Sequence, residues 1–177
     1  MRPSLTLLFT SSNHWWSRVI QFFSKSRCSH VMVGLDLWGT PAVLEADVGG
    51  VQFLPRSRFF GKGDQMLVAE FAIRPEVHLR AAIEELGDRY DYVGLLGYAL
   101  VMIARRLGRK IKNPLASPKA MVCSEFALAL NRDGTIPAWV GLDPEATSPG
   151  DLLAICEHSA SFERLPGTEM VKPVRPV

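Results

Sequence analysis

Apolar and polar residues alternate over short runs in the first half of the chain. In the segment SHVMVGLDL, residues 29–37, one side of an extended chain carries four aliphatic residues from Val31 to Leu37, and the other carries His30, Met32, Gly34 and Asp36. This period of two is typical of a β-strand with one deeply buried face and one mixed face. Four similar apolar runs predict further strands, at residues 5–9, 42–47, 50–54 and 65–73.

The apolar period becomes helical after Pro75, where leucine, alanine and isoleucine recur every three or four residues until Gly87. Asp91 is well placed to cap a long helix that Gly108 closes. Two more helices are expected, one over the segment 122–134 and one that begins after Ser148. Strands in the first half and helices in the second predict an α+β fold, in which an antiparallel sheet of about five or six strands packs against helices.

One early helix carries most of the aromatic residues. Asn13 is a candidate cap for it, and its apolar positions recur at helical spacing. The aromatic side chains form either a core-packing face, which is the favoured interpretation, or a groove for an apolar chain. They are Trp15, Trp16, Phe22 and Phe23.

The composition fits one globular domain. The chain has 177 residues, of which 47% are hydrophobic and 21% are charged. We expect a single domain over residues 1–165 and a loosely ordered tail over residues 166–177, which includes Pro173 and Pro176. The net charge of +2 is too small to indicate a nucleic-acid partner.

A basic cluster, residues 104–112, follows an apolar run that is too short to cross a membrane, since spanning requires roughly 20 residues. The favoured interpretation is a buried helix with cations in its last turn, and the alternative is weak contact with a membrane surface. The N-terminus lacks the apolar region of a secretory signal, and three cysteines form no even disulfide framework. We therefore expect a cytoplasmic protein.

His30 and Glu45 are candidates for a catalytic pair. If residues 36–39 form the turn, His30 lies directly across from Glu45 on neighbouring strands, where the carboxylate can accept the Nδ1 proton of the imidazole. A turn centred on residues 39–40 would place Gly34 opposite Glu45 instead. Asp47, on the same strand face, is the alternative acid.

Cys123 is the candidate nucleophile, because it lies at the predicted start of a helix. The thiolate is the reactive form of cysteine, and both a helix N-terminus and a nearby imidazolium stabilise it. Ser124 follows at the margin of the predicted site. Cys28 and Cys156 have no comparable setting, and we expect structural roles for them.

The order of four segments resembles the circularly permuted branch of the NlpC-type papain-like cysteine hydrolases, a broad group that includes lecithin retinol acyltransferase. The segments are SRCSHVMVGL, VLEAD, YDYVGLLGY and MVCSEFALAL, and the resemblance covers roughly residues 5–155. In this branch the histidine strand precedes the cysteine helix. The chain departs from its relatives at the N-terminal edge, where RPSLTLLFT replaces their glycine–aspartate pair.

The resemblance implies that Cys123 is the nucleophile of an amidase- or peptidase-like thiol hydrolase, that His30 is the general base and acid, and that Glu45 orients His30. Backbone N–H groups at the start of the cysteine helix would hold the oxyanion. Tyr90 matches a tyrosine that precedes an aspartate in relatives, and we place it with Ser124 and Trp15 at the substrate. The implied substrates are peptides, including cell-wall peptides, or acyl lipids, and no metal or other cofactor is implied.

Three alternatives remain at this stage. A lipid acyltransferase or thioesterase would use the same residues. A zinc site would use the cysteine-x-histidine sequences at 28–30 and 156–158, although positions 156 and 158 point about 200° apart on a helix. A binding or scaffold domain would keep the fold without the chemistry.

Overall fold

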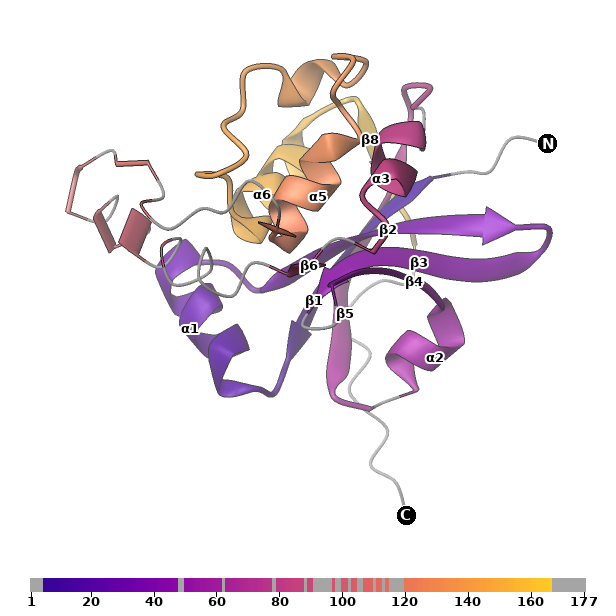
Figure 1. Cartoon of the computed structure of the whole chain (residues 1–177), viewed down its shortest axis with the longest axis horizontal. Coiled ribbons are helices and arrows are strands. Elements are labelled where there is room, and N and C mark those ends of the chain that lie inside the picture. Colours follow the sequence, from indigo (N-terminus) through magenta and orange to yellow (C-terminus); the bar gives the residue numbers. More distant parts are fainter. Residues whose placement is uncertain are drawn as a thin grey trace.

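A six-stranded antiparallel sheet forms the centre of the structure (Figure 1). The computed structural model describes residues 5–47, 50–61, 63–77, 79–87, 89–90, 97, 100–101, 103–104, 107–109, 111–112, 114 and 120–166. For residues 81–82, 89–90 and 120–121 it describes the backbone alone. The predicted α+β class and antiparallel sheet are confirmed.

The strands lie in the order β4-β3-β2-β1-β5-β8, and each neighbouring pair is antiparallel. Their bounds are β1 Thr6–Ser12, β2 His30–Leu37, β3 Thr40–Asp47, β4 Gly50–Pro55, β5 Gln65–Ile73 and β8 Phe162–Arg164. The first five occupy the predicted positions. The short strand β8 was not predicted, because it joins the sheet only by pairing with the end of β5.

The helices are α1 Trp15–Ser24, α2 Arg56–Phe60, α3 Arg80–Glu84, α5 Cys123–Ala129 and α6 Pro149–His158, with a 3-10 turn at Pro137–Trp139. A second, two-stranded sheet pairs β6 (Arg89–Tyr90) with β7 (Ala120–Met121) in parallel. The predicted cap of α6 is confirmed, since the Ser148 hydroxyl accepts from the Asp151 N–H at 2.9 Å. The predicted helix over 122–134 is shorter than expected and ends at Leu130.

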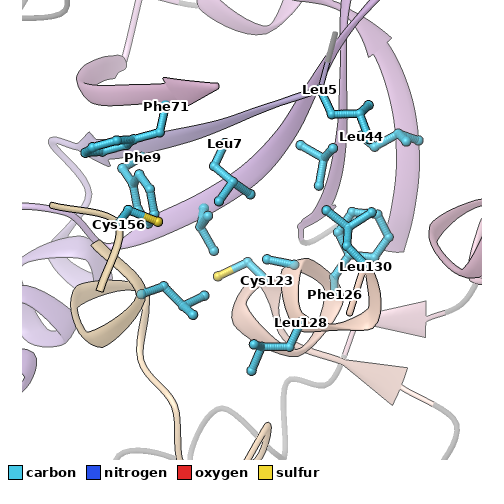
Figure 2. Packing of buried hydrophobic residues seen from close by; sticks show 14 of the residues in the cluster. Leu5, Leu7, Phe9, Leu44, Phe71, Cys123, Phe126, Leu128, Leu130 and Cys156 are labelled. Carbon is cyan, nitrogen blue, oxygen red and sulfur yellow. The ribbon is translucent and has the colours of Figure 1, made fainter. Parts of the chain in front are cut away.

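The sheet buries both of its faces. On one face, α5 and α6 contribute to the main core, together with residues such as Leu7 and Leu44 (Figure 2). On the other face, α2 inserts Phe59 among Leu8, Met32 and other apolar side chains. Helix α5 packs against both β2 and β3, which brings its first residue close to these two strands.

The β2–β3 register differs from both predicted registers. The turn consists of Trp38 and Gly39, with φ values of 52° and 84°. This two-residue turn pairs Leu37 with Thr40 and, at the other end of the ladder, Val33 with Leu44. The predicted four-residue turn was therefore too long, and the pairing moves by two residues. The shift keeps every side chain on its predicted face, because the side-chain period of a strand is two.

The helix α1 does not pack as predicted. It begins after His14 rather than Asn13, and its buried residue is Ser17. The core-packing interpretation of its aromatic residues is wrong for three of them, since Trp15, Trp16 and Phe22 are exposed. The polar side of the helix, rather than the aromatic side, faces the protein.

Several predictions lie wholly or partly outside the described residues. They concern the cap Asp91 and most of the helix predicted after it, parts of the basic cluster at 104–112, and the tail beyond residue 166. Within the described ranges, no helix has the length and apolar character needed to cross a membrane.

Candidate active site

Cys123 is the first residue of α5. The extended backbone of Val122 precedes it, and the Val122 N–H donates to the Glu125 carboxylate at 2.9 Å, which ties down the start of the helix. The Cys123 side chain projects from α5 into the core between the helix and the sheet (Figure 2), and the residue is 6% exposed. A nucleophile in this position is held rigidly and is largely shielded from water.

His30 and Glu45 meet at the end of the β2–β3 ladder. His30 is the first residue of β2, and Glu45 lies just beyond the last pair, Val33–Leu44. The His30 Nε2 atom is 3.3 Å from Glu45 Oε2. The two residues are thus diagonal neighbours rather than directly opposed, and long side chains can span such a diagonal.

Glu45 is fully buried, and both of its carboxylate oxygens have partners. Oε2 faces His30, while Oε1 accepts a hydrogen bond from Gln52 Nε2 at 3.1 Å. Gln52 lies directly opposite Glu45 in the β3–β4 ladder. A buried carboxylate is costly unless it is paired and hydrogen-bonded, and these two contacts satisfy that requirement.

The surroundings of His30 favour its charged form. Burial by itself lowers the pKa of the imidazole, but the charge of Cys123 and hydrogen bonds to Cys123 and Glu45 outweigh burial and raise the pKa well above its usual value. The His30 side chain is 16% exposed. His30 therefore contacts the carboxylate of Glu45 and interacts electrostatically with Cys123.

The ring atoms differ from the predicted arrangement. Nε2, rather than Nδ1, faces Glu45. An imidazole has two nitrogens, so Nδ1 is the ring nitrogen that does not contact Glu45. The predicted atom was wrong because it assumed direct opposition of the two strand positions, whereas the diagonal contact presents the far end of the ring to the carboxylate.

The other two thiols have different surroundings. Burial raises the pKa of Cys28 to about 12, against a lowering contribution from its hydrogen bond with Ser26. Burial also raises the pKa of Cys156, and an electrostatic interaction with the thiol of Cys28 adds to the effect. Both thiols therefore stay protonated, in agreement with the structural roles expected for them.

The predicted substrate-binding residues have different surroundings. Ser124 follows Cys123 on α5 and is 1% exposed, and its place at the margin of the site stays a prediction. Trp15 is exposed on α1, where its ring stacks on Trp16 with centroids 3.7 Å apart. The backbone of Tyr90 pairs with Met121, two residues before Cys123, but its side chain lies outside the description. Asp47 lies at the end of β3, and the contact with His30 belongs to Glu45.

Gln52 was missed by sequence reasoning. A signal for it exists, since a two-residue connection between Asp47 and Gly50 places residues 45 and 52 opposite each other. The observed pairs Asp47–Gly50 and Glu45–Gln52 follow this register.

The two side chains of the cysteine-x-histidine sequence at 156–158 have different surroundings. Cys156 is buried, whereas His158 is exposed and its Nδ1 lies 2.8 Å from the Ala154 carbonyl oxygen. Among the residues that the structure describes, no group of three or more histidine, cysteine, aspartate or glutamate side chains could hold a metal ion.

Comparison with known proteins does not assign the chain to a family. No family model matches the chain, and no curated protein matches it. Among solved structures, the chain is similar to the crystal structure of the metalloprotein yiiX from Escherichia coli O157:H7, labelled DUF1105. The two share 15% sequence identity with a TM-score of 0.48, over 92% of this chain and 95% of the other. A likeness at this level carries no functional argument.

Proposed function

We propose that the protein is a thiol hydrolase of the permuted NlpC-type papain-like group, in which Cys123, His30 and Glu45 act on an amide, ester or thioester. The observation that carries the proposal is the position of His30, whose Nε2 lies 3.3 Å from Glu45 Oε2 and whose pKa is raised by its interaction with the neighbouring Cys123. A thiol, an imidazole and a carboxylate in this order form a nucleophile, a base and a group that orients the base. The permuted order is also kept, because β2 precedes α5 along the chain.

In the first step, the proton of the thiol resides on His30 and the thiolate of Cys123 attacks the carbonyl carbon of the substrate. The first N–H groups of a helix lack partners within the helix, and the N–H of Cys123 is therefore a suitable donor to the oxyanion. His30 then donates its proton to the leaving amine, alcohol or thiol, and an acyl-thioester on Cys123 remains.

In the second step, His30 accepts a proton from water, which attacks the thioester and releases the acid. Glu45 keeps the imidazole in one orientation and stabilises its charged form throughout the cycle. Gln52 in turn holds the other oxygen of Glu45. The acyl acceptor is water in this scheme, and a second alcohol or amine in the same place would make the enzyme an acyltransferase.

The rate at which iodoacetamide alkylates Cys123 between about pH 5 and pH 10 tests the proposal. We expect rapid alkylation at neutral pH in the wild type, and a large loss of that reaction in His30→Ala, because the imidazolium no longer stabilises the thiolate. His158→Ala, which changes an exposed histidine on α6, is the matched control and should react like the wild type. Peptide mapping by mass spectrometry identifies the alkylated residue.

If Cys123 reacts only at high pH, or if His30→Ala reacts like the wild type, the site has no ion pair and the scaffold interpretation replaces catalysis. A reactive thiol would justify a screen of acyl esters, acyl thioesters and peptide amides. Burst kinetics of product release would then report the acyl-enzyme, and Cys123→Ser should abolish the burst.

A further inference from the structure

The helix α1 presents its aromatic side to solvent. Trp15 is 60% exposed, Trp16 is 42% exposed and Phe22 is 63% exposed, whereas the buried residue of the helix is Ser17. Large aromatic side chains are normally the first to be buried, and a serine is normally left outside. The helix is therefore oriented opposite to an ordinary surface helix.

The helical geometry shows how complete this reversal is. At about 100° per residue, the apolar side chains of α1 fall within an arc of about 160° around the helix axis. Ser17 lies about 160° from Trp15 and about 140° from Phe22 around the same axis. The direction that is most buried is thus polar, and the direction that is most exposed is aromatic.

Polar contacts hold α1 in this orientation. The hydroxyl oxygens of Ser17 and Ser29 lie 2.6 Å apart in a buried position. Ser17 also accepts hydrogen bonds from the Ser12 N–H and from Gln21 Nε2. Ser29 directly precedes His30, so the contact between Ser17 and Ser29 adjoins the candidate active site. These hydrogen bonds fix the polar side of the helix against the protein, and the apolar residues Val19, Ile20 and Phe23 are half-buried at its flanks.

The charges on and beside α1 are favourable for an anionic surface. The helix contains Arg18 and no acidic residue, and Lys25 follows at its end. Both basic side chains are exposed. Asp64 is paired with His14, the residue before the helix, and Glu157 with Arg27, three residues after its end.

We propose that α1 is an interfacial helix that docks the protein on an anionic phospholipid bilayer. Tryptophan and phenylalanine favour the boundary between headgroups and acyl chains, and basic residues are attracted to anionic lipids. In Figure 1 the helix lies toward one edge of the drawing, away from α2 and α3. Docking through the aromatic side of α1 would leave Ser29, and with it the start of β2, behind the helix on the side away from the bilayer. The proposal does not depend on the chemistry of Cys123.

Flotation with vesicles tests the proposal. One set of vesicles contains phosphatidylcholine with about 30% phosphatidylserine, and the other contains phosphatidylcholine alone. We expect the wild type to bind the anionic vesicles more strongly, and the double variant Trp15→Ser, Phe22→Ser to lose about tenfold or more in the partition coefficient. Arg18→Gln should weaken binding about fivefold, since each basic residue near the surface contributes about that factor.

Two control variants separate α1 from other exposed apolar residues. Trp38, at the tip of the β2–β3 turn, is 98% exposed, and Leu107, in the basic cluster, is 73% exposed. Trp38→Ser and Leu107→Ser should both bind vesicles like the wild type. Thermal melting followed by circular dichroism checks that the α1 variants are folded, which we expect because the substituted side chains are exposed.

Four results would overturn the proposal. One is a wild type that fails to float with anionic vesicles at low salt, and another is an α1 double variant that floats as well as the wild type. A third is a loss of binding in Leu107→Ser while the α1 variants keep it, which would assign the contact to residues 104–112. The fourth result comes from analytical ultracentrifugation, which measures whether the chain forms a dimer. A dimer that depends on Trp15 and forms without vesicle binding would assign the aromatic side of α1 to a second copy of the chain. Cys123 alkylation, measured separately, reports on the catalytic proposal in every case.

Discussion

The Nε2 atom of His30 lies 3.3 Å from Oε2 of Glu45, although the two residues are not paired in the sheet. The ladder between their strands ends at Val33–Leu44, and the side chains meet just beyond that end. The contact is shielded, because Glu45 is fully buried and the His30 side chain is 16% exposed. A charge-assisted hydrogen bond in such surroundings is stronger than the same bond in water.

Replacement of Glu45 by glutamine should slow the alkylation of Cys123 at neutral pH and lower the rate of acyl-enzyme formation by about 10²–10⁴-fold, the usual range for general acid–base groups. Glutamine keeps the size of the side chain but removes the charge that helps to raise the pKa of His30. The rate–pH profile checks this prediction. Asp47→Asn is the matched control on the same strand, and an equal effect of both variants would count against a specific role for Glu45.

Gln52 is predicted to position Glu45. Gln52→Ala removes the hydrogen bond to Oε1, and we expect about a fivefold to tenfold loss of Cys123 reactivity at neutral pH, as for a bond to a charged group. A chemical-shift titration of the His30 ring distinguishes positioning from general destabilisation, since only positioning lowers the pKa of His30. Phe53→Thr, which changes the next residue of β4 and an exposed side chain, should leave that titration unchanged.

His30 should make stability depend on pH in one direction. Its pKa is raised in the folded state, so the folded protein holds the proton more tightly than the unfolded chain does. The resulting stabilisation is complete below the unfolded pKa of about 6.5 and is lost as the pH rises through the folded-state value. The free energy of unfolding, measured by urea titration, should therefore fall more steeply above neutral pH in the wild type than in His30→Gln. Parallel curves for the two proteins would contradict the raised pKa.

The three cysteines should differ sharply in reactivity. At pH 7 and limiting iodoacetamide, we expect modification of Cys123, while Cys28 and Cys156 react only after unfolding, because burial raises the pKa of both thiols. Mass spectrometry of tryptic peptides measures each site. Cys28→Ser should preserve the reactivity of Cys123, and equal labelling of all three thiols in the folded protein would contradict this account.

Gly34 is required by a close approach between two strands. A Cβ atom at this position would lie 2.3 Å from Thr6 Oγ1 and 2.4 Å from Leu8 Cδ1. Gly34→Ala should therefore destabilise the fold by about 1–3 kcal/mol, the usual cost of overpacking, as measured by urea unfolding. Gly39→Ala, in the turn, has open space around its Cβ but a φ of 84°, so its cost arises from the backbone instead. Relief by Thr6→Ala or Leu8→Ala in the Gly34→Ala background would separate the two mechanisms.

The strands could be predicted because each carries its own evidence. β5 coincides with the apolar run at 65–73, and β2 begins and ends within one residue of its predicted bounds. The cap of α6 was equally local, since Ser148 and Asp151 satisfy each other within one turn. By contrast, β8 was missed because its three residues become a strand only through pairing with β5.

The sequence by itself determined the α+β class, the strand positions and the three residue types that form the candidate site, because alternation, helical period and residue chemistry are written locally along the chain. The tertiary structure decided the rest. A two-residue turn set the β2–β3 register, which made His30 and Glu45 diagonal neighbours and directed Nε2 to the carboxylate. The tertiary structure also turned the aromatic side of α1 outward, since the buried contact between Ser17 and Ser29 holds the helix. Both outcomes depend on residues distant in sequence, whose combined packing no local pattern encodes.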